Sequence, residues 1–88
     1  MASYNVHFKP SVEKDLRRLP KTMMARVLQV LEGLGSDPLR ERAIKLSGAE
    51  RLYRIRVGDY RIIYEVDSRA KEVLVHYIRH RREAYRAL

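Results

Sequence analysis

One stretch, Leu52–Val66, constrains the fold of this chain more than any other. Its apolar and polar residues alternate on either side of Gly58-Asp59, a dipeptide typical of the two-residue turns that join antiparallel strands. Such a turn also fixes which residues face one another across the hairpin. The facing apolar pairs are then Val57 with Tyr60, Ile55 with Ile62, and Tyr53 with Tyr64. The sequence therefore predicts a hairpin with one apolar face that covers a hydrophobic core.

The opposite face of this hairpin is basic. It carries Arg54 and Arg56 on the first strand, and the same register places Arg61 directly opposite Arg56. Like charges in direct cross-strand contact oppose pairing by roughly 0.2–1 kcal/mol, so folding does not account for this arrangement. Two interpretations stay open. Either the arginines lie on a solvated sheet face with their stems over apolar surface, or their planar donor forks form a receptor for phosphate or carboxylate.

Length and composition restrict what surrounds the hairpin. The chain has 88 residues, which suits a single domain spanning 1–88, and 45% of them are hydrophobic, which is enough for a globular core. No apolar run approaches the roughly 20 residues that span a bilayer, and no signal-peptide pattern begins the chain. We therefore expect a cytoplasmic protein with no membrane partner. Because cysteine is absent, disulfides and thiolate metal sites are excluded.

The charge balance favours a polyanionic partner. Lys and Arg number 19 against 11 Asp and Glu, which gives a formal net charge of +8 and a pI of about 10.2. A pI in this range is typical of nucleic-acid-binding domains. From Arg51 onward arginine far outnumbers lysine. This preference indicates recognition of phosphate by geometry rather than by a diffuse positive field.

The remaining segments predict two helices and two further strands around the hairpin. Before the hairpin we expect a strand at Tyr4–Phe8, helices from Ser11 to Pro20 and at Lys21–Gly33, and a loop at Gly35–Glu50. After it we expect a polar turn at Asp67–Lys71 and a strand at Val73–Ile78. Val73, Val75 and Tyr77 should lie on one side of that last strand. The helices have apolar residues at helical spacing, which are Val12, Leu16 and Leu19 in the first and Met24, Val27, Leu28 and Leu31 in the second. Residues 79–88 form either a short helix or a loosely held tail.

Basic residues from separate parts of the chain should converge on the arginines of the hairpin. In a meander the end of the third strand lies beside Tyr60 and Arg61, which brings in residues 79–82. The RNA-binding candidates beyond the hairpin are Lys45, Arg79 and Arg82, with Arg81 beside them. Arginines among aromatic rings suit a phosphodiester backbone with stacked bases. Strand parity turns the tyrosines of the hairpin inward for packing, whereas Tyr85 lies among basic residues, where its hydroxyl can enter a site.

Few titrating groups are available for catalysis. The histidines, His7, His76 and His80, are scattered and share no carboxylate at metal-ligand spacing, so no metal site and no cofactor is predicted. His80 is the candidate acid or base, because it stands between two arginines and imidazole titrates near neutrality. Metal-free RNA cleavage needs few such groups, since the ribose 2′-hydroxyl is the nucleophile and cations stabilise the transition state. DNA lacks that hydroxyl, so such a site is specific for RNA.

Three runs of this sequence resemble one known family. They are Lys45-Leu46-x-Gly48, the hairpin Leu52–Val66, and His80-Arg81-Arg82-Glu83-x-Tyr85. They resemble the RelE/ParE superfamily of toxins from prokaryotic toxin–antitoxin pairs, and the RelE branch in particular. The resemblance implies an α+β fold of order β-α-α-β-β-β, with a helical hairpin packed on a small, mainly antiparallel sheet and a short C-terminal helix. It also implies an endoribonuclease that cuts mRNA in the A site of the 30S ribosomal subunit and so inhibits translation.

The resemblance also assigns expected roles to individual residues. Arg54 and Arg56 stand where RelE-type toxins place two basic residues, often lysines, that contact phosphates and assist proton removal. Arg61 matches an arginine that stabilises the transition state. Arg81 matches a basic residue implicated in protonating the leaving group, and Tyr85 matches a tyrosine that orients the nucleotide.

Arginine at the positions where lysine is common changes the acid–base chemistry. A guanidinium stays protonated at any working pH and is a poor general base, which leaves His80, Tyr85 or a residue of the ribosome to remove the proton. The ParE branch shares the fold but poisons DNA gyrase without cutting RNA, and this is the first alternative function. A non-catalytic RNA-binding module is the second. Both branches imply a cognate antitoxin protein as partner.

Overall fold

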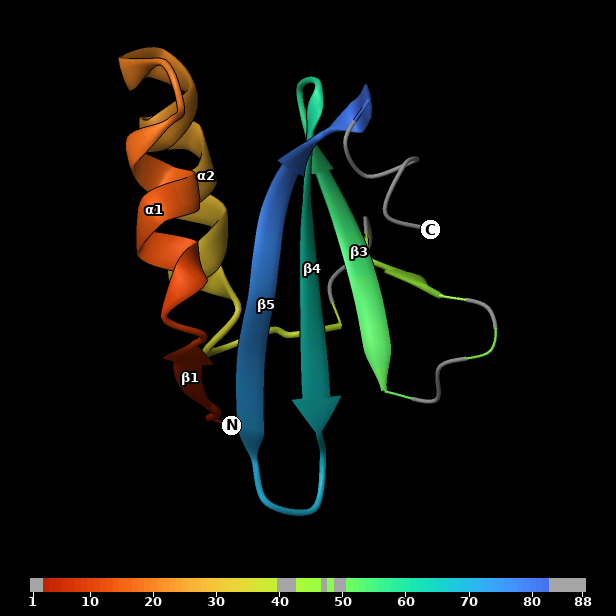
Figure 1. The fold of residues 1–88 in the computed structure, drawn as a ribbon. Helices are drawn as coiled ribbons and strands as arrows, with labels where there is room; N and C mark the ends of the chain where they lie inside the picture. Colours follow the sequence, from red (N-terminus) through yellow and green to blue (C-terminus); the bar gives the residue numbers. More distant parts are fainter. Residues whose placement is uncertain (1–2, 40–42, 47, 49–50, 83–88) are drawn as a thin grey trace.

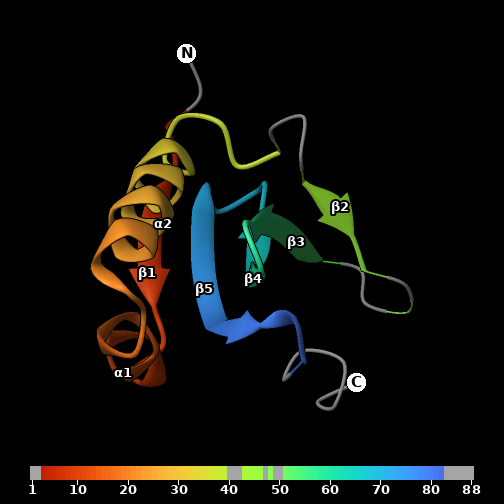
Figure 2. The ribbon, with the colours of Figure 1, turned by 90° about the horizontal axis from the view of Figure 1, so that it is seen from above.

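The sheet and the helices form two layers. The structure, a computed structural model, describes residues 3–39, 43–46, 48 and 51–82. Its elements are β1 (Asn5–Phe8), α1 (Ser11–Arg17), α2 (Lys21–Gly33), β2 (Ile44–Lys45), β3 (Leu52–Val57), β4 (Tyr60–Asp67) and β5 (Glu72–His80). The strands form one sheet in the order β1-β5-β4-β3-β2, and both helices lie on the same side of it (Figures 1 and 2).

This is the α+β architecture that the sequence predicts. β1 runs parallel to β5, and every other neighbouring pair is antiparallel. The sequence did not predict β2, because its two residues lie inside the loop expected at Gly35–Glu50 and are too few for an alternating pattern. Arg81 and Arg82 are helical, and the rest of the expected C-terminal helix lies outside the described residues.

The register of the β3–β4 hairpin is the one that its turn predicts. Val57 pairs with Tyr60, Ile55 with Ile62, Tyr53 with Tyr64 and Arg56 with Arg61. Gly58 has φ of +59°, a backbone conformation that glycine adopts without a steric penalty. The first residue of the turn must adopt this conformation, so the glycine fixes the pairing of both strands.

A bulge in β5 changes which residues share a face. Tyr64 pairs with Val75 but Ile63 pairs with Tyr77, so His76 is an extra residue in β5. The sequence placed Tyr77 on the same side as Val75, and this prediction is wrong because the extra residue reverses the alternation beyond it. β5 also extends to His80, two residues further than expected.

The helical hairpin covers the apolar face as predicted. α1 begins at Ser11 and ends at Arg17, before Pro20, and Val12 and Leu19 are buried. In α2, Val27 and Leu31 are buried against the sheet, whereas Leu28 is 40% exposed. The two buried side chains are spaced four residues apart, so they face the sheet from consecutive turns.

Tyr64 lies at the centre of the core. It is fully buried, and its hydroxyl donates a hydrogen bond of 2.6 Å to the carbonyl oxygen of Pro38. The ring of Tyr53 stacks beside it with a centroid distance of 5.9 Å. The tyrosines of the hairpin therefore pack inward, as their strand parity predicts. No helix in the described part of the chain is long and apolar enough to span a bilayer.

Candidate functional site

The side of the sheet away from the helices gathers three arginines. We call the surface formed by Arg54, Arg56 and Arg61 the arginine face. Ile55 and Ile62 alternate with these arginines along β3 and β4 and point into the core, so the arginines point to the other side. Arg56 is exposed, Arg54 is half-buried and Arg61 is only 5% exposed. Three arginine side chains thus extend from one face of a rigid β-hairpin.

Pairing across the sheet puts like charges next to one another. Arg61 lies directly opposite Arg56 on β3 and directly opposite Arg79 on β5. The convergence of the end of β5 with the start of β4, which the meander predicts, is confirmed by this register. A row of three arginines across neighbouring strands opposes folding and favours an anion.

The side chain of Arg54 contains a buried donor. Among the residues that the structure describes, its buried Nε has no hydrogen-bond partner. A buried donor left in this way costs free energy, and an incoming oxyanion recovers it. The geometry of Arg54 therefore agrees with the anion-receptor interpretation rather than with a fully solvated side chain.

Asp15 of α1 holds the end of β5 from the side. Its carboxylate is 7% exposed and accepts hydrogen bonds from the Ile78 backbone N–H at 3.0 Å and from the Arg79 guanidinium at 2.6 Å. The Arg79 guanidinium also lies over the Tyr77 ring, 4.9 Å from its centroid. Sequence analysis did not find this contact, because Asp15 and Arg79 are far apart in the chain and no local pattern links them.

His80 lies on the other side of the sheet from Arg61. It pairs with Tyr60, and their rings meet edge to face with a centroid distance of 5.3 Å. Because Tyr60 alternates with Arg61, its partner His80 points toward the helix side. The structure therefore does not bring the predicted acid or base onto the arginine face. Regular alternation from Val73 would have put His80 on the arginine face, so only the bulge at His76 accounts for its placement.

Arg81 and Arg82 lie beside the hairpin turn. The Arg81 backbone N–H donates to the Asp59 carbonyl oxygen at 2.7 Å. Together with His80 and Asp59, these two arginines line an open hollow of about 390 Å³. This anchor places the start of the C-terminal segment at the same end of the sheet as Arg56 and Arg61. Tyr85 lies outside the described residues.

Lys45 is placed apart from the arginines. It pairs with Tyr53 and is exposed, whereas its neighbour Ile44 pairs with Arg54. The register thus assigns Lys45 to the helix side of the sheet, contrary to the expectation that it would reach toward the arginine face.

Glu65 and His76 form a pair that sequence analysis did not single out. Glu65 Oε1 and His76 Nε2 are 2.9 Å apart, and both side chains are partly buried. Glu65 alternates with Tyr64, so the pair lies on the arginine face, at the end away from Arg56. Among the described residues, no three His, Asp or Glu side chains are grouped so as to hold a metal ion.

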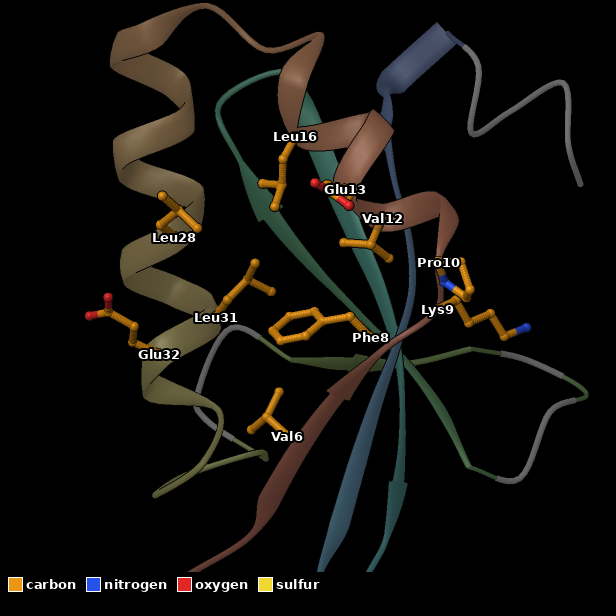
Figure 3. A pocket seen from close by; sticks show the side chains of 10 residues that line it. All are labelled: Val6, Phe8, Lys9, Pro10, Val12, Glu13, Leu16, Leu28, Leu31 and Glu32. Atoms are coloured by element: carbon orange, nitrogen blue, oxygen red, sulfur yellow. The ribbon is translucent and has the colours of Figure 1, made fainter.

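A larger hollow of about 590 Å³ lies between β1 and the helices. Apolar side chains dominate its lining, including Val6, Phe8, Leu28 and Leu31, and only Lys9 and two glutamates add charge (Figure 3). Phe8 is 50% exposed at its rim. This lining does not suit phosphate, and exposed apolar surface of this kind is typical of contacts with another protein.

Comparison with known proteins agrees with this architecture. The family model described as the ParE toxin of type II toxin–antitoxin systems, parDE, matches residues 6–85. The toxin RelG of Mycobacterium tuberculosis is 30% identical over 94% of this chain and 97% of its own length. The RelE chain of the archaeal RelE–RelB complex from Pyrococcus horikoshii is 37% identical with a TM-score of 0.79, over 90% of this chain and 96% of that one.

A second archaeal structure extends the same likeness. The RelB–RelE antitoxin–toxin complex from Methanococcus jannaschii contains a chain that is 26% identical, with a TM-score of 0.79, over 93% of this chain and 98% of that one. The family match spans both helices and the whole β3–β4–β5 meander that carries the arginine face. This chain is therefore a RelE-like member of the ParE toxin family of type II toxin–antitoxin systems.

Proposed function

We propose that this protein is a ribosome-dependent endoribonuclease that cleaves mRNA in the A site of the 30S subunit and so stops translation. The observation that carries the proposal is the buried Arg61 held directly opposite Arg56 on a rigid sheet. Fixed cations of this kind stabilise charge that develops in a transition state, because they need no reorganisation when the reaction occurs. The likeness to the solved RelE structures from two archaea supports the same assignment.

The proposed reaction uses the RNA as its own nucleophile. The ribose 2′-oxygen attacks the adjacent phosphorus, the bond from phosphorus to the 5′-oxygen breaks, and a 2′,3′-cyclic phosphate and a 5′-hydroxyl remain. The proton of the 2′-hydroxyl passes to a base, and the departing 5′-oxygen takes up a proton. The protein aligns the attacking oxygen with the leaving group and neutralises the phosphate as its charge rises.

Each arginine has a distinct task in this proposal. Arg54, with its available Nε, and the exposed Arg56 bind phosphate oxygens of the mRNA. Arg61 donates to the oxygens of the scissile phosphate in the transition state. Arg81, anchored beside the hairpin turn, assists protonation of the leaving oxygen, and Tyr85 orients the nucleotide.

The general base comes from outside the arginine row. Guanidinium does not lose its proton at working pH, and His80 faces the helix side of the sheet. Tyr85 and a group of the ribosome are the remaining candidates from the sequence. A base supplied by the ribosome would make cleavage depend on the ribosome, as the proposal requires.

We also propose a cognate antitoxin as the protein partner. The structures of RelE with RelB from two archaea support this expectation. A chain with a formal charge of +8 favours an acidic segment in such a partner. Covering the arginines with carboxylates would block RNA and toxin activity together.

The description of the matching family model favours one alternative. It names the ParE toxin, whose branch poisons DNA gyrase, so a gyrase inhibitor without nuclease activity is the second candidate. In that case the arginine face binds DNA gyrase and no phosphodiester bond is cleaved. The two candidates differ in their target and can be separated directly.

The test uses the purified chain with ribosomes programmed with a defined mRNA. We expect cleavage at the A-site codon, products with a 2′,3′-cyclic phosphate, and no cleavage when the ribose at the scissile position is 2′-deoxy. Supercoiling by DNA gyrase is measured in parallel with the same protein. Intact mRNA together with inhibited supercoiling would replace the nuclease proposal with the gyrase alternative.

Two double variants that remove the same charge test whether cleavage depends on the arginine face. Arg54→Ala/Arg56→Ala removes two cations from the face and should lower cleavage by at least about 100-fold. Arg51→Ala/Arg69→Ala removes two exposed arginines near the far end of the sheet and should leave cleavage within about twofold of wild type. Equal losses in both doubles would show that only net charge matters.

A further inference from the structure

Asp15 occupies a position that β1 leaves open. β1 pairs with β5 only as far as Phe8 opposite Val75, and the residues that the structure describes place no strand beside the edge of β5 beyond that point. The Asp15 carboxylate takes up the Ile78 N–H on this edge at 3.0 Å, as a strand would. α1 therefore replaces the missing strand with one buried side chain.

The same carboxylate determines where Arg79 points. Arg79 stands opposite Arg61 in the sheet, where its cation would join the arginine face. Instead its guanidinium lies 2.6 Å from Asp15 Oδ2 and over the Tyr77 ring. Because Asp15 is 7% exposed, water screens this ion pair little, and both groups are held in one geometry.

We propose that Asp15 is a positioning residue that keeps Arg79 out of the phosphate-binding set, by holding its guanidinium at the outer edge of β5. The set is then limited to Arg54, Arg56 and Arg61. This inference rests on the proposed RNA chemistry, because it concerns how many cations of the face contact the nucleic acid backbone. It replaces the sequence-based prediction that Arg79 binds RNA.

Withholding one cation has a physical consequence for RNA binding. Each phosphate neutralised by Lys or Arg releases condensed counterions, so the logarithm of the binding constant falls with the logarithm of salt concentration by about 0.7 per contact on single strands. The slope therefore counts the arginines that the RNA uses. A change in general stability does not raise this count.

The experiment measures that slope with a labelled single-stranded RNA whose riboses carry 2′-O-methyl groups, so that no cleavage occurs. Anisotropy titrations over a range of KCl concentrations give the slope for each variant. Asp15→Asn keeps an oxygen for the Ile78 N–H and removes the charge that holds Arg79. We expect its slope to be steeper than that of wild type by about 0.7, with tighter binding at low salt.

Two further variants connect the effect to Arg79. Asp15→Asn/Arg79→Gln should return to the wild-type slope, because the released cation is gone. Glu13→Gln is the matched control, since it removes the same charge from the same helix and frees the exposed Arg17 from its 2.7 Å pair. Its slope should equal that of wild type, because Arg17 lies away from the arginine face.

Several outcomes would overturn the inference. An unchanged slope in Asp15→Asn, or a steeper slope that persists in the double variant, would show that Asp15 does not hold Arg79 back. If Asp15→Asn fails to fold, Arg79→Gln alone decides, because the inference requires the wild-type slope and a slope shallower by about 0.7 contradicts it. Wild-type protein that leaves mRNA intact on ribosomes would instead contradict the proposed function, whatever the slopes show.

Discussion

The two faces of the sheet share one register but follow opposite rules. On the helix side, Ile55 faces Ile62 and Tyr53 faces Tyr64, so each pair removes apolar surface from water. On the arginine face the same strands set Arg56 against Arg61, which weakens pairing. Residues that are adjacent in β4 therefore have different roles. The helix side stabilises the fold, and the arginine face uses part of that stability to hold cations together.

This difference means that fold and activity should respond to separate substitutions. A change on the helix side should alter the free energy of unfolding and leave the chemistry of the folded molecules intact. A change on the arginine face should alter cleavage and have a smaller effect on the free energy of unfolding. Arg61 and Ile62 are adjacent in sequence and point to opposite faces, so they offer the sharpest comparison.

The largest effect is expected from Ile62→Ala. Ile62 is fully buried between the sheet and the helices, and its truncation leaves a cavity, so the free energy of unfolding should fall by about 2–5 kcal/mol. Urea denaturation followed by circular dichroism measures the change. Ile44→Ala is the control, because the same side chain is 51% exposed there and should cost much less. Equal losses at both positions would abolish the distinction between a core and an open face.

Arg61→Ala tests the arginine face and should affect cleavage more than stability. Cleavage of ribosome-bound mRNA is expected to fall by about 100- to 1,000-fold, because a fixed donor to the transition state is lost. Its free energy of unfolding should fall less than that of Ile62→Ala, since removing one of two facing cations offsets some of the lost packing. Single-turnover rates on programmed ribosomes measure the first quantity. Full cleavage in this variant would remove Arg61 from the mechanism.

Tyr64→Phe tests a polar contact within the apolar side. The variant keeps the ring but leaves the buried Pro38 carbonyl oxygen without the 2.6 Å hydrogen bond, which should lower the free energy of unfolding by about 1–3 kcal/mol. Cleavage by the folded fraction should stay the same. Thermal unfolding and cleavage are measured on one preparation. A stability equal to that of wild type would mean that the Pro38 oxygen finds another donor.

The smallest effect, and the only gain in stability, is expected from Arg56→Thr. Threonine is β-branched and uncharged, so it suits a strand and removes the like charge opposite Arg61. The free energy of unfolding should rise by roughly 0.2–1 kcal/mol while cleavage weakens. Urea denaturation checks the sign. Lower stability would show that Arg56 contributes more by packing its stem than it costs by repulsion.

Local patterns were enough to predict the hairpin and its arginines. The Gly58-Asp59 turn defines the register, and alternation then separates Arg54, Arg56 and Arg61 from the core residues. The helical hairpin also follows from the spacing of Val12, Val27 and Leu31. These features depend on neighbours in the sequence, where periodicity carries the information.

The parts that the sequence did not predict depend on long-range contacts or on an irregular strand. The ion pair of Asp15 with Arg79 joins α1 to β5, and nothing in the local sequence around Asp15 indicates a partner so far along the chain. The bulge at His76 leaves no compositional signal, so Tyr77 was assigned to the wrong face. His80 was assigned to the site because of its arginine neighbours, although the bulge turns it to the helix side.

The extra residue at His76 makes the arginine row depend on how β5 pairs as well as on composition. Beyond the bulge, odd-numbered residues of β5 share the face of Arg61, whereas before it they share the face of Tyr64. Deleting this one residue would make Val75 and Tyr77 consecutive opposite Tyr64 and Ile63, so Ile78 and Arg79 would keep their present faces. If His76 instead took a regular place opposite Ile63, Ile78 would pair with Arg61 and Arg79 would turn to the helix side, so the bulge is what brings Arg79 opposite Arg61.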